Sequence, residues 1–244
     1  MMKMEEQMVI DKLILFGLTR QEAAVYLCLY RRGGLTGYEA AKYTGISRSN
    51  VYNALSGLAD KGAAYLEEGS ASRYVAVQVE EFCENKISSL VKEKEYLTEH
   101  IPKERKEEVG YLTITGCDNI LDKAVNMLKE AQKRVYLSAS YEKIQLLKKE
   151  LCGVAKRQIK LVLITDKEPE DEGLRAGSIC YIGAGRGNDI RLIIDSGYAL
   201  TGELNGTKED TCLYTGQENF IKVFKEALRN EITLIQLKEK ENIK

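Results

Sequence analysis

Apolar residues recur at three- and four-residue spacing through the first part of the chain, a pattern typical of amphipathic helices. Thr19-Arg20-Gln21-Glu22 is a capping box that begins one helix, and Gly33-Gly34 ends it. A second capping box at Thr36-Gly37-Tyr38-Glu39 begins a short helix that stops at Gly45. Ser47 is expected to cap a third helix, which runs to Lys61-Gly62.

The last two of these helices have the spacing of a helix-turn-helix, with about four residues and a glycine between them. Ala40 and Ala41 are small enough for the helices to cross closely, and Ile46 is suited to fill the junction. Strand-prone runs at 63–67 and 73–77 then flank the turn residues 68–72, where a wing would lie. An ordinary helical hairpin shares the helix spacing, but the added β-hairpin favours a winged helix-turn-helix.

The segment 80–108 is highly charged, contains no glycine and places apolar residues at alternating steps of four and three. This is a heptad pattern, and roughly three heptads can pair two helices modestly. Lys94 falls on the same seam and would weaken the pairing, and Pro102 marks a kink or an end. The alternative is one amphipathic helix packed on its own chain. We predict a dimerisation helix with the seam residues Ile87, Leu90, Leu97 and Ile101.

From residue 109 onward, short apolar strands alternate with helical stretches, which is typical of an α/β domain with a partly parallel sheet. The pattern also predicts a tight hairpin turn at Asp195-Ser196-Gly197. Strands are expected at 111–115, 134–139, 159–164, 179–182, 190–195, 198–203 and 211–214, and helices at 118–132, 142–156 and 218–235. The chain is therefore predicted to be an α+β and α/β multidomain protein, divided into 1–79, 80–108 and 109–244.

Composition narrows the classes of function. Lys and Arg total 36 against 37 Asp and Glu, so any nucleic-acid footprint must be local. The N-terminus lacks a basic start and no apolar run is long enough to span a bilayer, so we expect a cytoplasmic protein without membrane contact. The six cysteines are far apart, so we expect neither a metal site nor a cofactor. The only histidine, His100, lies among charged residues, which excludes most enzyme templates that depend on histidine.

The third helix carries the candidate chemistry. Its first turn and a half presents polar side chains opposite the face formed by Val51, Leu55 and Leu58, and recognition helices read bases with such N-terminal positions. A solvated polar face would show the same pattern, but the preceding helix and the hairpin favour contact with double-stranded DNA. Few local basic groups imply modest affinity per monomer, which favours a homodimer on two half-sites of an operator. The predicted DNA-binding residues are Arg48, Ser49, Asn50, Asn53, Tyr52, Lys42, Lys61 and Arg73.

Residues 18–77 resemble the DNA-binding domain of the TrmB family of archaeal and bacterial regulators, most of which respond to sugars. The resemblance rests on Leu18-Thr19 with Glu22-Ala23, on Gly45-Ile46-Ser47-Arg48-Ser49 with Val51-Tyr52, and on Lys61-Gly62 with Arg73-Tyr74. Asp195, Gly202, Tyr214-Thr215 and Asn219-Phe220 carry a weaker resemblance in the C-terminal part. It implies a C-terminal domain similar to the phospholipase D fold, without that fold's catalytic residues.

The sequence departs from this family at two places. Its wing carries Glu67 and Glu68 with Arg73 as the only base, whereas family wings are often more basic, so strong binding of the wing to phosphate is in doubt. Ser47 stands where the family usually has proline, and either residue starts a helix well.

Ligands of α/β sheets bind beyond the carboxyl ends of the strands, where loops and helix N-termini offer amides and hydroxyls. We therefore expect the last domain to bind a small polar effector such as a sugar or a sugar phosphate. The same polar residues could instead be caps and turn residues. Gly183 to Asn188 resembles a dinucleotide-binding loop but lacks the third glycine and precedes a strand, so a flexible loop is expected. The predicted effector-binding residues are Ser138, Ser140, Thr165, Asp166, Thr215, Gln217 and Asn219.

Two other classes of function compete with an effector-controlled transcription factor. One is a winged-helix module that binds proteins and has no effector. The other is an enzyme, for which Asp166, Asp195 and Glu203 are the acidic candidates, although no convergent pair is visible. Hydrolysis of the phospholipase type is excluded, because His100 and Lys103 have neither the required spacing nor a place in the α/β domain.

Overall fold

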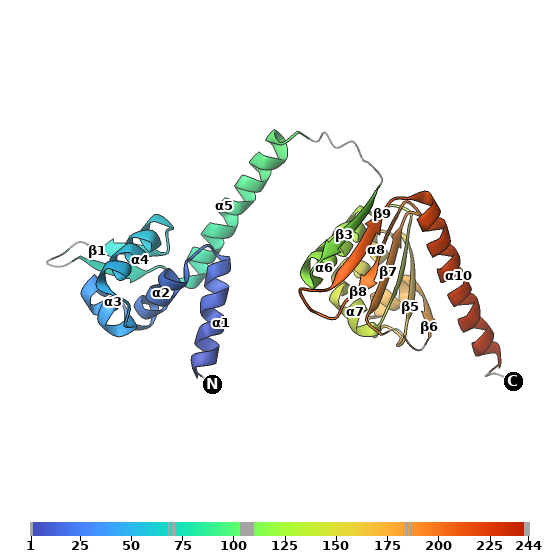
Figure 1. Cartoon of the computed structure of the whole chain (residues 1–244), viewed down its shortest axis with the longest axis horizontal. Helices are drawn as coiled ribbons and strands as arrows, with labels where there is room; N and C mark the ends of the chain where they lie inside the picture. The colour runs from blue at the N-terminus through green and yellow to red at the C-terminus, as the bar shows by residue number, and fades with distance from the viewer. Residues whose placement is uncertain are drawn as a thin grey trace. The chain divides into compact units, whose positions relative to one another are not determined.

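The structure is a computed structural model that describes residues 2–67, 69, 72–102, 110–183, 185 and 187–241. Contacts within the chain divide it into two compact units, Met1–Glu104 and Arg105–Lys244. Each unit has its own buried core, so each is described by itself (Figure 1). Within the described part of the chain, no helix is both long enough and apolar enough to cross a membrane.

The first unit is a winged helix-turn-helix followed by a long helix. α3 and α4 are the two helices of the predicted motif, and β1 pairs with β2 as an antiparallel hairpin in which Ala64 faces Ala76. Gly69 and Ser72 are described within the expected wing turn, whereas Glu68, Ser70 and Ala71 lie outside the described residues. The elements are α1 (Met2–Leu15), α2 (Arg20–Arg32), α3 (Gly37–Thr44), α4 (Arg48–Asp60), β1 (Ala64–Glu67), β2 (Arg73–Ala76) and α5 (Val79–His100).

Both predicted capping boxes form. The hydroxyl of Thr19 accepts a hydrogen bond from the backbone N–H of Glu22, whose carboxylate accepts one from the N–H of Thr19. Thr36 and Glu39 repeat this arrangement at the start of α3. Ser47 does occupy the N-cap of α4, but the prediction that it caps the helix is wrong, because its side chain makes no capping hydrogen bond. Its hydroxyl lies 3.5 Å from that of Ser49 instead.

The core of the first unit joins all of its helices. Ala40 is fully buried and Ala41 nearly so, which confirms that small side chains allow α3 to pack closely, and Ile46 packs against the same core. The hydroxyl of Tyr26 donates a hydrogen bond of 2.8 Å to the backbone oxygen of Val77, so α2 is tied to the end of the hairpin. α1 was not predicted from the sequence, and Leu13 is its only fully described side chain that is buried.

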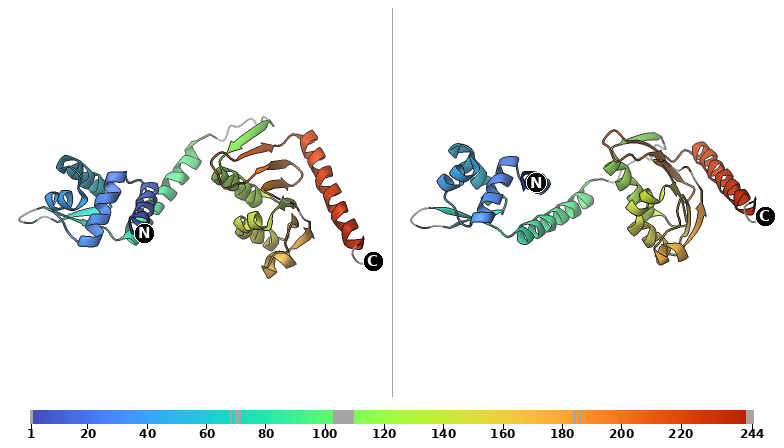
Figure 2. Two further views of the ribbon diagram at one scale, coloured as in Figure 1. Left: turned by 60° about the horizontal axis from the view of Figure 1, so that its bottom comes forward. Right: turned by 90° about the horizontal axis from the view of Figure 1, so that it is seen from below.

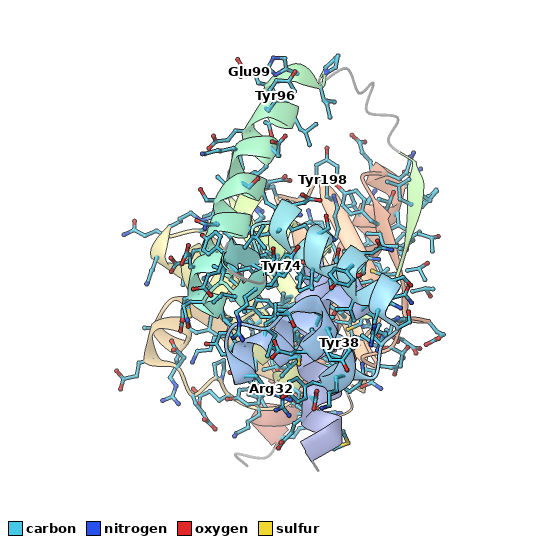
Figure 3. All side chains as sticks on the ribbon, turned by 90° about the vertical axis from the view of Figure 1, so that its left-hand side faces the viewer. Arg32, Tyr38, Tyr74, Tyr96, Glu99 and Tyr198 are labelled. Atoms are coloured by element: carbon cyan, nitrogen blue, oxygen red, sulfur yellow. The ribbon has the colours of Figure 1, made fainter. Side chains whose placement is uncertain are left out.

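α5 is attached to this core only at its beginning. Phe82 is 2 % exposed and its ring lies 6.0 Å from that of Tyr26. The helix ends at His100, which confirms that Pro102 marks an end, and residues 103–108 of the predicted segment lie outside the described residues. Tyr96 lies in the last turns of α5 (Figure 3). His100 is exposed, and its ring stacks on that of Tyr96.

The second unit is a mixed seven-stranded sheet covered by helices. The strand order is β3-β9-β8-β7-β4-β5-β6; β4, β5 and β6 are parallel and the other pairs are antiparallel. The elements are β3 (Tyr111–Thr115), α6 (Cys117–Glu130), β4 (Arg134–Ala139), α7 (Tyr141–Leu146), α8 (Lys148–Lys156), β5 (Lys160–Thr165), α9 (Glu172–Ala176), β6 (Ser178–Ile182), β7 (Asp189–Ile194), β8 (Tyr198–Glu203), β9 (Thr211–Thr215) and α10 (Glu218–Glu241).

Alternate residues of the strands face two different cores. Helices α6, α7 and α8 cover one face of the sheet, and α10 covers the other (Figure 2). Val135 and Leu137 belong to the core on the first side, whereas Tyr136 packs against the core on the side of α10. This is the period-two alternation of a sheet that is buried on both faces. All seven predicted strands match within one residue at each end, but the helix expected at 142–156 is broken near Leu147 into α7 and α8, and α9 was not predicted.

The predicted turn at Asp195-Ser196-Gly197 joins β7 to β8 and carries a structural carboxylate. Asp195 and Ser196 have φ angles of +50° and +58°, values that suit a two-residue reversal with the twist of a hairpin. The side chain of Asp195 accepts hydrogen bonds of 2.7–2.9 Å from three consecutive backbone N–H groups, those of residues 132, 133 and 134. The turn is thereby fixed to the segment that enters β4.

Candidate nucleic-acid interface and ligand hollow

The two faces of α4 separate polar from apolar residues as expected. Val51, Leu55 and Leu58 are completely buried. The opposite face belongs to the first turn and a half of the helix and is open to solvent. Its exposed polar residues are Arg48, Ser49, Asn50 and Asn53. Four hydrogen-bonding side chains are therefore presented together at the N-terminal end of one helix, where recognition helices contact base edges.

An aromatic residue of α3, which the sequence did not single out, supports this face. The guanidinium carbon of Arg48 lies 4.4 Å from the centroid of the Tyr38 ring, a cation–π contact that restricts the arginine. Arg32 lies in the same way over Tyr43, at 4.0 Å. The signal in the sequence was two tyrosines on the polar side of a short helix, each within reach of an arginine from a neighbouring helix.

Tyr52 occupies an intermediate position. Its side chain is 53 % exposed, yet its ring lies so close to Gly37 that a Cβ added there would be 2.5 Å from the ring. A larger residue at this start of α3 would force the ring to shift. Tyr52 thus helps to hold α3 against α4, and its exposed edge remains available at the interface.

Lys61, which the sequence predicts to contact phosphate, makes an ion pair within the first unit. Its ammonium group lies 2.5 Å from the carboxylate of Glu22, whose side chain is only 8 % exposed. Burial raises the pKa of Glu22, but hydrogen bonds from Lys61 and Thr19 outweigh it and hold the pKa below its usual value. A Cβ on Gly57 would collide with this carboxylate, so glycine in the middle of α4 makes the ion pair possible. Lys61 therefore stabilises the packing of α4 on α2.

The other predicted cations, Lys42 and Arg73, lie on α3 and on the first residue of β2. Lys42 is exposed on α3 and has no ion pair within the described part of the chain. Arg73 donates a hydrogen bond of 3.1 Å to the backbone oxygen of Gly34, which fixes the base of the wing. Glu67 is exposed beside it on β1. The wing accordingly offers one base and one acid among its described residues.

The seven residues predicted to bind an effector do not converge. Ser138, Ser140, Thr165 and Asp166 lie at the carboxyl ends of β4 and β5. β9 runs in the opposite direction to the strands beside it and lies three strands away from β4. Thr215, Gln217 and Asn219, at the end of β9 and just after it, therefore form a second group, which lies roughly 14 Å across the sheet from the first group. A single site formed by all seven is therefore excluded by the antiparallel order of β7, β8 and β9.

Several of these residues have partners inside the protein. The carboxylate of Asp166 accepts hydrogen bonds from the backbone N–H of Tyr141, at 2.7 Å, and from the hydroxyl of Thr165, at 3.3 Å. The hydroxyl of Thr215 donates to the backbone oxygen of Gly110 and accepts from the N–H of Gln217. These contacts are those of caps and turns, the alternative role considered for them.

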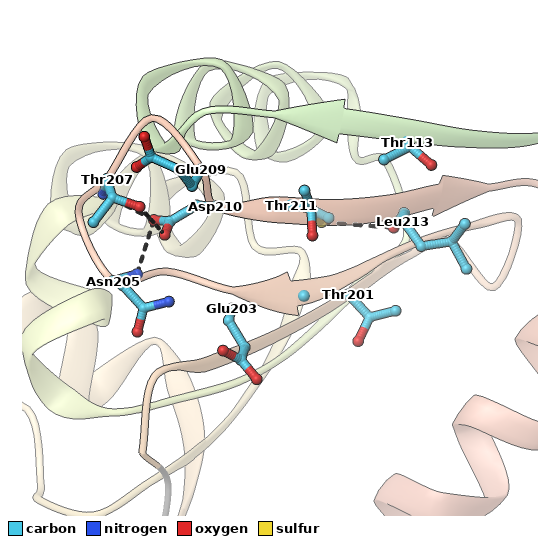
Figure 4. Close-up of a pocket in the computed structure, with 11 residues that line it drawn as sticks. Thr113, Thr201, Glu203, Asn205, Thr207, Glu209, Asp210, Thr211 and Leu213 are labelled. Atoms are coloured by element: carbon cyan, nitrogen blue, oxygen red, sulfur yellow. Dashed lines mark hydrogen bonds between the residues drawn. The ribbon is translucent and has the colours of Figure 1, made fainter.

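A hollow of about 570 Å³ lies elsewhere on the sheet, over the middle of β3, the start of β9, the end of β8 and the loop between β8 and β9 (Figure 4). Its walls carry the carboxylates of Glu203 and Glu209, the amide of Asn205 and the hydroxyls of threonines at 113, 201, 207 and 211. No cation is found among its lining residues, all of which belong to the described part of the chain. The hollow therefore offers hydrogen bonds that suit a neutral ligand rich in hydroxyl groups.

The loop at the rim of this hollow is held by one carboxylate. Asp210 accepts hydrogen bonds of 2.8–3.2 Å from the backbone N–H groups of Asn205, Gly206 and Thr207, and one of 2.7 Å from the hydroxyl of Thr207. Burial raises the pKa of Asp210, but the bonds from Thr207 and Asn205 outweigh it and lower the pKa to about 2. The Asn188 amide also donates to the Asn205 side chain. Residues around the hollow are thus fixed before any ligand arrives.

The acidic residues considered for an enzyme serve other purposes. Asp195 accepts hydrogen bonds from three backbone N–H groups, and these lower its pKa against the opposing effect of burial. Asp166 supports the start of α7, and Glu203 lies in the hollow. No cluster of metal-ligating side chains occurs among the described residues, and all six cysteines are free. Ala184 and Arg186, within the expected glycine loop, lie outside the described residues.

The solved structures that are similar to this chain have low similarity scores. TrmBL2, described as an archaeal chromatin protein with a novel mode of DNA binding, aligns at 20 % identity with a TM-score of 0.46, covering 93 % of this chain and 98 % of its own. NucT from Helicobacter pylori aligns at 17 % identity with a TM-score of 0.41, covering 50 % of this chain and 94 % of its own. Scores at this level carry no argument about function.

Two curated proteins are similar in sequence. YrhO of Bacillus subtilis, an uncharacterized protein, is 29 % identical over 164 residues, which are 66 % of this chain and 59 % of that protein. TrmBL1 of Pyrococcus furiosus, an HTH-type sugar sensing transcriptional regulator, is 28 % identical over 166 residues, or 66 % of this chain and 48 % of that protein. The chain thus spans about half the length of the curated relatives it matches.

Two family models match successive parts of the chain. Residues 13–80 match the sugar-specific transcriptional regulator TrmB, and residues 111–230 match the N-terminal subdomain of the TrmB EBD. Both models describe transcriptional regulators, which agrees with the expectation that the chain is not an enzyme. The matched regions correspond to the winged helix-turn-helix and to the mixed-sheet unit in the order found here, and the chain therefore belongs to the TrmB family of transcriptional regulators.

Proposed function

We propose that this chain is a sequence-specific DNA-binding regulator of transcription in which α4 reads base edges in the major groove. The exposed polar face at the start of α4 carries this proposal. Arg48 suits the acceptor pair of guanine, and Asn50 and Asn53 suit the donor and acceptor of adenine. Tyr38 supports this reading because its ring restricts Arg48, which lowers the entropy lost when the arginine binds a base.

The proposed regulator acts as a homodimer held by α5. Leu90 and Leu97 of the predicted seam are 55 % and 51 % exposed, and Ile87 and Ile101 are as open. The alternative, a helix packed on its own chain, requires cover for this face, and no described residue of the first unit provides it beyond the first turns of α5. Pairing the seams of two copies would bury these side chains and place two α4 helices on one operator.

The proposed effector is a small neutral sugar that binds in the hollow over β3, β9 and β8. Carboxylate, amide and hydroxyl groups match sugar hydroxyls, and the absence of cations from its walls disfavours a phosphorylated sugar there. The effector acts only if it binds the DNA-competent and incompetent states with different affinities, so sugar and DNA must each change the affinity for the other.

Selection of binding sites from a random-sequence DNA pool tests the first proposal. The full chain should enrich one inverted-repeat sequence, and fluorescence anisotropy should show tighter binding to it than to a scrambled duplex. Enrichment of no sequence, with equal affinity for all duplexes, would contradict base reading. It would instead favour the competing function, a winged-helix module that binds proteins.

Calorimetry with a panel of neutral sugars tests the effector site. A sugar that binds the wild type should bind more weakly to Glu203→Gln and Asn205→Ala, because each removes a hydrogen-bonding group from the hollow. Ser138→Ala, on a different part of the sheet, is the matched control. A sugar whose affinity falls with the control variant and not with the hollow variants would place the site at the carboxyl ends of β4 and β5.

A further inference from the structure

A second cavity lies in the C-terminal unit, between α10 and the sheet, and its chemistry differs from that of the hollow. It measures about 220 Å³ and is bounded by β4, β5 and β6 on one side and by α10 on the other. Lys160 lines the cavity from β5, and Lys225 and Arg229 line it from α10. Tyr136 and Tyr181 complete its polar lining. Residues from four elements, distant in the sequence, therefore converge on one small space.

The lining of this cavity carries an excess of positive charge. Three of its lining residues are cations, and none is a carboxylate. Lys160, Lys225 and Arg229 form no ion pair among the described residues, although Glu218 and Glu226 line an adjoining hollow that shares Lys225 and Arg229. Lys225 and Arg229 stand four residues apart on one helix, a spacing at which like charges destabilise the helix. An anion between them would remove that repulsion.

The uncharged residues of the lining indicate the shape and polarity of the ligand as well as its charge. Tyr136 and Tyr181 are half-buried in the core beneath α10, where each carries a phenol hydroxyl, and Leu228 is almost completely buried there. Phenol hydroxyls donate hydrogen bonds to anionic oxygens, while their rings and Leu228 offer an apolar wall to a carbon skeleton. The volume equals that of roughly seven water molecules, which restricts the ligand to a few heavy atoms beyond one anionic group.

We propose that this cavity binds a phosphate group, presented by a small phosphorylated metabolite or as free phosphate. Lys160, Lys225 and Arg229 hold the phosphate oxygens, and Tyr136 and Tyr181 contact the remainder of the molecule. The site is separate from the hollow proposed for a neutral sugar and does not depend on that proposal or on DNA binding. The cavity is lined by cations and the hollow by carboxylates. The C-terminal unit therefore has two sites on one face of the sheet that prefer ligands of different charge.

Titration calorimetry of the full chain at low ionic strength tests the proposal, with inorganic phosphate, glycerol 3-phosphate and glycerol as probes. Both phosphate compounds should bind more tightly than glycerol at this cavity, and added salt should weaken their binding. Tighter binding of glycerol 3-phosphate than of inorganic phosphate identifies a phosphorylated metabolite as the ligand. Equal binding of the two identifies free phosphate.

Substitutions locate the binding. Lys225→Gln and Arg229→Gln should each weaken both phosphate compounds roughly tenfold, because each removes a charge-assisted hydrogen bond. Lys160→Gln gives an independent check from β5 should the changes on α10 disturb the helix. Lys149→Gln, on the exposed side of α8 over the other face of the sheet, is the matched control and should change nothing. Circular dichroism verifies that each variant is folded.

Three results would overturn the proposal. The first is that neither phosphate compound binds the folded wild type. The second is that Lys149→Gln weakens binding as much as the cavity variants do, which would indicate unspecific attraction to surface charge. The third is that the cavity variants lower the affinity for DNA when no phosphate compound is present, because the three cations would then be DNA contacts.

Discussion

The face of α4 and the hollow of the C-terminal unit are both surfaces of clustered polar side chains, but they are built differently. Four residues within six positions of one helix make the first. The strands β3, β8 and β9, with the loop between β8 and β9, form the second. A single helix keeps its shape when its outward side chains change, whereas the hollow depends on turns that hold separate strands in place. Changes at the first should affect binding, and changes around the second should also affect stability.

The largest expected effect comes from removing the polar face of α4. Combined replacement of Arg48, Asn50 and Asn53 by alanine should lower the affinity for the selected operator by at least about 3 kcal/mol, since each base contact contributes roughly 1–3 kcal/mol. The melting temperature should hardly change, because all three side chains are exposed. Anisotropy and thermal unfolding measure the two quantities. Unchanged operator affinity in the folded variant would exclude α4 as the reading helix.

Disruption of the proposed dimer should have the next largest effect. Leu90→Lys with Leu97→Lys places two charges on the seam of α5, and light scattering should then show monomers. Affinity for an inverted-repeat operator should fall about a hundredfold, because the second half-site no longer binds intramolecularly. Lys92→Leu, on the same helix but off the seam, is the control and should remain a dimer. Persistence of the dimer in the double variant would place the interface elsewhere.

Asp195→Asn should show that the C-terminal unit depends on its turns. The variant keeps a side chain that tolerates a positive φ, but its amide cannot accept all three backbone hydrogen bonds. The free energy of unfolding should fall by about 1–3 kcal/mol, which urea unfolding measures. Asp122→Asn, exposed on α6, should have almost no effect. A variant as stable as the wild type would mean that the turn does not need the carboxylate.

Gly57→Ala tests how far the placement of α4 depends on a contact outside its polar face. Alanine favours a helix by about 1 kcal/mol over glycine, yet its Cβ would collide with the buried carboxylate of Glu22 and disturb the pair with Lys61. We expect a net loss of about 1 kcal/mol in the free energy of unfolding. Ser56→Ala, on the exposed side of the same helix, should be neutral. A stabilised Gly57→Ala would show that Glu22 moves aside without cost.

The smallest expected effect is a dependence on pH at the rim of the hollow. The pKa of Asp210 is lowered from 3.8 to about 2, so its carboxylate favours the folded state at every pH above about 4. This contribution is lost as the pH falls from about 4 to about 2, where the folded protein takes up the proton. Urea unfolding at several pH values should show this loss in the wild type. Asp210→Asn should lack that part of the dependence, and identical profiles would contradict the assignment.

The sequence predicted most of the fold because its signals are local. Capping boxes at Thr19 and Thr36 and the alternation of apolar residues in β4 and β5 each act within a few positions. The errors have a local cause as well. Ser47 occupies a cap position without forming the cap, and the break near Leu147 has no proline or glycine to announce it. α1 and α9 present too few buried apolar residues for a periodic signal.

The shared face of the polar residues of α4 was predicted better than the grouping of the effector candidates, for the same reason. Arg48, Asn50 and Asn53 share a face because a helix has a fixed period, so their common exposure follows from spacing alone. The grouping of Thr165 with Thr215 assumed that strand ends converge, but that holds only for parallel strands. The ion pair between Lys61 and Glu22 joins the C-terminal end of α4 to α2. No spacing in the sequence predicts a contact between residues so far apart in the chain.

The sequence by itself determined the order of the helices and strands, the inward and outward faces of α4 and the unusual scarcity of histidine. Only the tertiary structure decided that Lys61 is occupied by a buried acid, that α10 covers one face of the sheet, and that cations from β5 and α10 share a cavity. The physical reason is the distance along the chain over which each interaction acts. Backbone periodicity and capping act over a few residues, whereas strand order and the convergence of charges are settled by how distant segments pack together.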